Sequence, residues 1–129
     1  WLRPLCLGQL ARQPAGAPDA AGIGTDMAHY LLIYDLAPDY LERRAAFREA
    51  HLALAWRSVE RGDLLLGGAL ADPAAQAMLL FEGEGPEAAE TFAQDDPYVA
   101  AGLVTRWRVH RWTTVVGADA STPVRPDDR

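Results

Sequence analysis

Several residue types that active sites often use are missing or rare in this chain of 129 residues. All 12 basic residues are arginine, so there is no lysine for Schiff-base chemistry or for a phosphate-binding P-loop. The single cysteine, Cys6, excludes an intramolecular disulfide and a zinc site built from several cysteines. Asparagine is also missing, and together with abundant alanine and arginine this indicates a bacterium with a GC-rich genome.

Positive charge and long apolar runs are scarce as well. The net charge of −6 argues against a nucleic-acid partner, because the phosphate backbone binds basic surfaces. No apolar run approaches the roughly 20 residues of a membrane span. Half of the residues are apolar and 23% are charged, which is ordinary globular composition. We therefore expect one small, soluble, cytoplasmic domain without a membrane or nucleic-acid partner.

The two ends of the chain lack the pattern of a packed domain. Residues 1–26 begin with Trp1, show no period and collect proline, glycine and alanine, and their apolar stretch is too short and interrupted for a signal peptide. We interpret Met27 as the true start, with residues 1–26 a disordered or mis-assigned extension. Residues 117–129 are polar and contain proline, so a flexible tail is expected there. The predicted domain spans residues 27–116.

Within that domain the hydrophobic pattern predicts an α+β fold of the ferredoxin-like β-α-β-β-α-β type. The first apolar run is typical of a strand buried on both faces, and a long helix follows in which apolar residues recur at spacings of three, four and seven. The last strand alternates, with Trp107 and Val109 on one face and Arg108 and His110 on the other. Strands are expected at residues 29–36, 63–70, 77–83 and 105–116, and helices at 40–61 and 86–94.

Such a fold leaves one face of its sheet uncovered. Both helices pack on the same face, and strands as apolar as these do not leave the opposite face in water. A homodimer that closes two sheets face to face would cover it. Gly67 and Gly68 in the second strand leave room for another backbone or a ligand to approach.

Two short stretches contain candidate functional residues. In "REAHL", His51 stands at the border of the apolar face of the long helix, with Arg48 one turn before it. Taken alone, this pattern favours a boundary histidine bonded to a backbone carbonyl over a functional one. In "DDPYVAAGL", Asp96 precedes a proline and could simply cap a short helix, with Tyr98 a core aromatic whose hydroxyl reaches the rim.

Taken together these stretches resemble the YciI-like (YCII-related) domain family of small bacterial proteins, from about Met27 to Trp112. The shared features are a helical histidine with arginine three residues before it, a glycine-rich second strand and an Asp-Pro-Tyr stretch before the last strand. The family's Gly-Pro in the second strand is replaced by Gly68-Ala69. The resemblance implies a dimeric α+β barrel with a His–Asp active site, which falls on His51 and Asp96.

The function predicted from this pair is that of a small cofactor-free lyase or isomerase. A buried carboxylate bonded to one ring nitrogen fixes the tautomer of a histidine, and the other nitrogen is then free to take a proton from a substrate. We expect His51 to act as the acid or base, Asp96 to orient it, and Arg48, Tyr98 and Gly68 to bind a small organic substrate.

No cofactor and no metal are expected. The histidines at 29, 51 and 110 have no metal-ligand spacing. Serine and cysteine residues lie outside the motifs, which argues against acyl-enzyme chemistry. The alternative function is a non-catalytic dimeric module that binds a ligand, in which the His–Asp pair only shapes a pocket.

Overall fold

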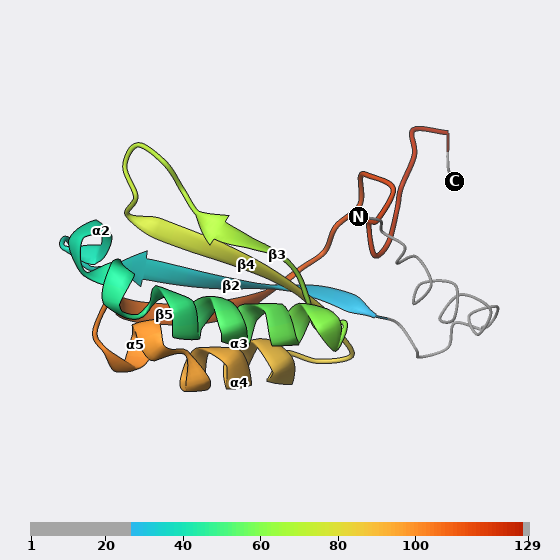
Figure 1. Cartoon of the computed structure of the whole chain (residues 1–129). Helices are drawn as coiled ribbons and strands as arrows, with labels where there is room; N and C mark the ends of the chain where they lie inside the picture. Colours follow the sequence, from blue (N-terminus) through green and yellow to red (C-terminus); the bar gives the residue numbers. More distant parts are fainter. Residues whose placement is uncertain (1–26, 128–129) are drawn as a thin grey trace.

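The computed structural model describes residues 27–127 and shows a four-stranded antiparallel sheet with its helices on one side (Figure 1). The strand order is β3-β4-β2-β5. Strand β4 is antiparallel to both of its neighbours, β3 and β2. This confirms the ferredoxin-like β-α-β-β-α-β fold. The predicted extension over residues 1–26 lies outside the described residues. In chain order the elements are β2 (Ala28–Leu36), α2 (Tyr40–Arg43), the 3-10 helix η2 (Arg44–Ala46), α3 (Arg48–Glu60), β3 (Leu64–Ala69), β4 (Gln76–Gly83), α4 (Glu87–Asp95), α5 (Pro97–Ala100) and β5 (Val104–Trp112).

The single long helix predicted for residues 40–61 is divided into α2, η2 and α3. The bend falls at Phe47, which has φ −117° and ψ −1° and packs against the core. Residues before the bend leave the apolar face of α3, and Leu41 is 56% exposed. The spacing of apolar residues did not reveal this break, because the sequence between Tyr40 and Arg61 contains no proline or glycine to mark it.

The core lies between the sheet and the helices. Alternate residues of β2, Tyr30, Leu32 and Tyr34, point toward the helices and are almost completely buried. Phe81 of β4 and Phe92 of α4 pack edge to face at 5.6 Å between ring centroids. The prediction that the first strand is buried on both faces is wrong for a single chain, because the residues between these three are only half-buried.

The opposite side of the sheet, which we call the open face, carries apolar side chains with no helix over them among the described residues. Leu31 pairs with Leu80 and Ile33 with Met78, so these four side chains share that face. All four are half-buried in the single chain, and Leu66, which also pairs with Leu80, is 72% exposed. Trp112 extends the open face at one end and is 47% exposed.

The segment after β5 turns back on itself. The last strand ends at Trp112 and not at residue 116. The Val124 amide donates to the Val115 carbonyl at 2.8 Å, and the Ser121 amide donates to Thr114 Oγ1 at 2.7 Å. Thr114 Oγ1 also lies 2.6 Å from Nδ1 of the buried His29. The polar composition did not predict these contacts, and the flexibility of residues 117–129 stays a prediction.

Leu32 and Leu41 provide a test of the core. Leu32 is fully buried, so Leu32→Ala should lower the free energy of unfolding by about 2–5 kcal/mol. Leu41→Ala removes the same atoms from an exposed site and should change it by less than about 0.5 kcal/mol. Urea unfolding at one fixed protein concentration measures both changes. Equal losses in the two variants would contradict this placement of the core.

Candidate active site

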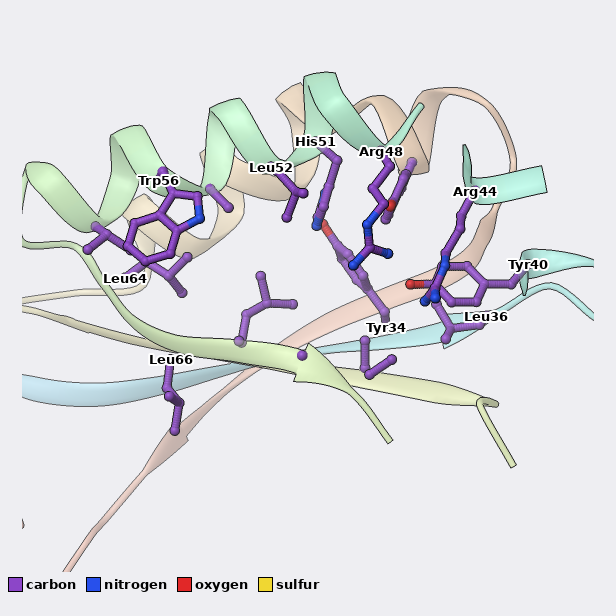
Figure 2. A pocket seen from close by; sticks show the side chains of 18 of the residues that line it. Tyr34, Leu36, Tyr40, Arg44, Arg48, His51, Leu52, Trp56, Leu64 and Leu66 are labelled. Atoms are coloured by element: carbon purple, nitrogen blue, oxygen red, sulfur yellow. The ribbon is translucent and has the colours of Figure 1, made fainter. Parts of the chain in front are cut away.

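A cavity of about 340 Å³ lies between α3 and the sheet, beside the edge strand β3 (Figure 2). Its walls come from β2, β3 and β4, from the three helical segments between residues 40 and 60, and from Tyr98 of α5. His51 extends from α3 into this space. Of the residues that the sequence predicts for the site, His51, Arg48, Tyr98 and Gly68 line the cavity, and Asp96 lies behind His51.

Asp96 is held at the junction between α4 and α5. Because it precedes Pro97, its backbone is extended, with φ −73° and ψ 122°, and α4 ends there. Its Oδ1 accepts a hydrogen bond from the Tyr98 amide at 3.0 Å, which makes it the N-cap of α5. The capping interpretation of the sequence is therefore correct.

The same carboxylate also holds His51. Nδ1 of His51 lies 2.8 Å from Asp96 Oδ1, and the Tyr34 hydroxyl donates to Oδ2 at 2.6 Å. Asp96 is fully buried, so these donors replace the water that an ionised carboxylate would otherwise need. An ionised carboxylate only accepts hydrogen bonds, which places the hydrogen of a neutral imidazole on Nδ1 and the free lone pair on Nε2.

Aromatic rings fix the plane of the imidazole. The His51 ring stacks on Tyr98 with 3.9 Å between centroids and an angle of 8°, and it meets Phe92 edge-on at 6.1 Å. Nε2 has no hydrogen-bond partner among residues 27–127, and the side chain is 15% exposed. The ring is therefore oriented from two sides, and one nitrogen is left for a ligand in the cavity.

The Tyr34 and Tyr98 phenols are hydrogen-bond donors at neutral pH. Burial, and then the charge and the hydrogen bond of Asp96, raise the pKa of Tyr34 far above its ordinary value. Burial is also the largest cause that raises the pKa of Tyr98, while the positive charges of Arg48 and Arg44 act in the opposite direction. Both hydroxyls therefore keep their protons where the protein is expected to work.

The two glycines of β3 have different positions. Gly68 lines the cavity, but it pairs with Met78, so a side chain there would project from the open face. Gly67 pairs with Leu79 on the helix side, and a Cβ there would lie 3.3 Å from Leu79 Cγ. A side chain at position 67 would therefore project on the helix side, where the cavity lies, and Gly67 leaves that space free.

The sequence analysis did not identify four residues of the site: Tyr34, Tyr40, Arg44 and Trp56. Tyr34 could have been predicted from its position, because a tyrosine on the buried side of a strand needs a hydrogen-bond partner for its hydroxyl. Helical spacing predicts Arg44 on the same side as Arg48 and His51, and all three line the cavity, but that spacing gave Arg44 no role of its own. Trp56 belongs to the apolar residues whose spacing predicts the buried face of the long helix, whereas it lines the cavity and is 58% exposed.

Residues 27–127 contain neither a cluster of metal-ligating side chains nor a helix that could span a membrane. No three histidine, cysteine, aspartate or glutamate side chains in that range come together in a group that could hold a metal ion. No helix in the same range is long and apolar enough to cross a bilayer.

Comparison with known proteins identifies the family. The model of the YCII-related domain matches residues 27–113. The chain belongs to this family. Two curated relatives, each called Protein YciI, come from Escherichia coli O6:H1 (strain CFT073) and Shigella flexneri. Each is 36% identical to this chain over 83 residues, which cover 57% of the chain and 85% of the relative. The family predicted from the motifs is confirmed.

A solved structure supports the same fold. It is 5-chloro-2-hydroxyhydroquinone dehydrochlorinase (TftG) from Burkholderia phenoliruptrix AC1100, in complex with 2,5-dihydroxybenzoquinone. The TM-score is 0.56 at 23% identity, over 67% of this YCII-related chain and 94% of the other. At this identity the likeness shows the fold alone, which is the ferredoxin-like α+β fold.

Tyr34→Phe tests the hydrogen bond behind the His–Asp pair. It leaves Asp96 Oδ2 buried without its donor, so the free energy of unfolding should fall by about 1–3 kcal/mol. Tyr30→Phe is the matched control, because Tyr30 is buried in the same strand and its hydroxyl has no partner among the described residues. It should cost less than about 0.5 kcal/mol in the same urea experiment. A Tyr34 variant as stable as the control would argue against this bond.

Proposed function

We propose that the protein is a cofactor-free lyase or isomerase in which His51 and Asp96 transfer a proton on a small organic substrate. One observation carries the proposal: the imidazole lines a cavity while its Nδ1 lies 2.8 Å from a fully buried carboxylate. A carboxylate so placed stabilises the imidazolium that forms when Nε2 accepts a proton. The Tyr34 hydroxyl and the Tyr98 amide also donate to Asp96 and fix the position of its carboxylate beside His51.

The chemistry follows from that arrangement. His51 Nε2 takes a proton from a carbon or hydroxyl of the substrate, and the electron pair of the broken bond stays on the substrate. In an isomerase the same proton returns to another atom, whereas in a lyase the electron pair expels a leaving group. Asp96 keeps its negative charge throughout, because it is a hydrogen-bond acceptor from three donors and transfers no proton itself.

Substrate binding is assigned to Arg48, Tyr98 and the backbone around Gly68. Arg48 supplies positive charge at the cavity, and the protonated Tyr98 phenol can donate to a substrate oxygen. Gly68 also lines the cavity, so the backbone of β3 is close to a ligand bound there. The dehydrochlorinase of the same fold acts, by its name, on a chlorinated hydroquinone, which is a reason to include such compounds among the substrates tested.

We further propose that the protein is a homodimer that acts in the cytoplasm. The open face of one chain displays Leu66 and Trp112 together with half-buried leucine, isoleucine and methionine. A monomer would leave this apolar patch in water, whereas a second copy would cover it with an equal surface. Most of the cavity wall lies on the helix side of the sheet, and Leu66 of the edge strand β3 borders both the cavity and the open face.

His51→Ala tests the catalytic proposal. In a screen of hydroxy-aromatic compounds, lactones, halogenated acids and chlorinated hydroquinones, the variant should lose about 10²–10⁴-fold in kcat on any compound that the unchanged protein converts. Asp96→Asn should lower kcat by at least about 10²-fold. The amide NH₂ of asparagine can donate to Nδ1 of His51, which would place the imidazole proton on Nε2 instead. Glu49→Ala, on the exposed side of α3, is the control and should keep full activity.

The circular dichroism spectrum of each variant shows that a loss of activity is not a loss of folding. Equal turnover by the unchanged protein and His51→Ala would end the assignment of His51 as the acid or base. Binding of a compound without turnover across the whole screen would favour the non-catalytic ligand-binding module instead.

The dimer is tested by placing charge on the open face. Leu66→Glu/Trp112→Glu puts two carboxylates where the partner would bury them unpaired, which costs several kcal/mol, so the variant should be monomeric at micromolar concentration. Leu41→Glu adds a charge at a leucine of α2 whose exposure, 56%, lies between those of Leu66 and Trp112, and this variant should remain dimeric. Light scattering after gel filtration measures the mass. A folded monomer of the unchanged protein would refute the dimer.

A further inference from the structure

The cavity beside His51 has two chemically different ends. One end carries arginine and tyrosine side chains, and the other end is apolar. We propose that its ligand is a small organic anion with an apolar group, bound with the anionic end at Arg44 and Arg48 and the apolar end at Trp56. This deepens the proposed function, on which it rests for the role of His51, by naming the class of substrate.

The two arginines have no counter-ion in the described part of the chain. Neither Arg44 nor Arg48 lies within 4.0 Å of a carboxylate there, whereas Arg43 pairs with Asp39, Arg61 with Asp63 and Arg108 with Asp35. In a protein with a net charge of −6, carboxylates are plentiful. Two neighbouring guanidinium groups without one provide a binding site for a carboxylate or a phenolate.

Tyrosines place these charges at the cavity. Cζ of the half-buried Arg44 lies 5.5 Å from the centre of the Tyr40 ring, and Tyr40 packs edge to face on Tyr98 at 5.8 Å. Arg44 and Arg48 both influence the pKa of the Tyr98 phenol, so both charges act at one point. Figure 2 shows the two arginine side chains reaching down toward the strands, beside Tyr40. An anion there would receive a neutral donor as well as two charged ones.

The other end of the cavity is a wall of apolar side chains. Trp56 and Leu52 of α3 are 58% and 39% exposed although both line the cavity, and Figure 2 shows Trp56 next to Leu64. An indole left in water at a cavity wall gains free energy when an apolar ligand group covers it. Ala55 and Val59 extend the same surface.

The helix sets the spacing between the two ends. Trp56 lies eight residues after Arg48, which is about 12 Å along the axis of α3. His51 lies between them, about 4.5 Å from the level of Arg48. A ligand anchored at both ends therefore presents to His51 the carbon next to its anionic group. The matching compounds are aryl- or alkyl-substituted acids and phenolates, with the reacting proton near the negative charge.

Binding of three probes to the full-length protein tests the proposal. Phenylacetate has both groups, phenylacetamide replaces the charge with a neutral amide, and acetate lacks the ring. We expect phenylacetate to bind at least about tenfold more tightly than either of the others. It should also shift the nitrogen-15 NMR signals of both the Trp56 indole and the Arg48 guanidinium.

Variants assign each end. Arg44→Gln/Arg48→Gln should reduce the affinity for phenylacetate to that for phenylacetamide, and Trp56→Ala should reduce it to that for acetate. Arg57→Gln removes an exposed arginine of the same helix that does not line the cavity, and it should bind phenylacetate like the unchanged protein.

Three results would overturn the proposal: equal affinities for phenylacetate and phenylacetamide, an equal loss in Arg57→Gln, or no saturable binding up to about 10 mM. His51→Ala separates this proposal from the catalytic one, since it should bind phenylacetate with its preference intact. Preference without any turnover in the substrate screen would refute only the lyase or isomerase. Turnover that depends on His51, with equal binding of phenylacetate and its amide, would refute only the ligand class.

Discussion

The arrangement around the site depends on one buried carboxylate. Asp96 connects three parts of the fold: Tyr34 in β2, His51 in α3 and the first turn of α5. Each contact satisfies the same charge, so each element is positioned relative to the other two. A buried carboxylate that lost one donor would be strongly unfavourable, and this ties the order of the site to the stability of the fold.

The site also explains why α3 departs from an ordinary amphipathic helix. Its apolar stripe serves both the core and the cavity: Leu54 packs on the core, Leu52 and Trp56 line the cavity, and Ala55 and Val59 do both. A helix that only closed a core would bury its tryptophan. Here the sheet and α3 stand apart along β3, where Gly67 presents no side chain, and the space between them is available to a ligand.

The two sides of the sheet carry different features. The helix side holds the core and the cavity, while the open face carries the apolar surface that we assign to a second copy of the chain. Strand alternation makes this separation possible, because neighbouring residues of one strand point to opposite sides. Tyr34 therefore supports Asp96, while the residue before it, Ile33, belongs to the open face.

Local sequence was enough to determine the order of strands and helices, the cap at Asp96 and the family. These depend on short-range signals, namely apolar periodicity, the Asp-Pro pair and the spacing of "REAHL" from "DDPYVAAGL". The bend at Phe47 escaped because no helix breaker marks it. Whether Asp96 also pairs with His51 does not follow from local pattern, because it depends on where His51 lies across the fold; only the family resemblance implied the pair. Only the tertiary structure showed that Asp96 accepts from both His51 and the Tyr98 amide, and that Tyr34 donates to its second oxygen. Hydrogen bonds between residues 45 and 62 positions apart are decided by packing, which brings distant side chains within 3 Å, and no local pattern encodes that.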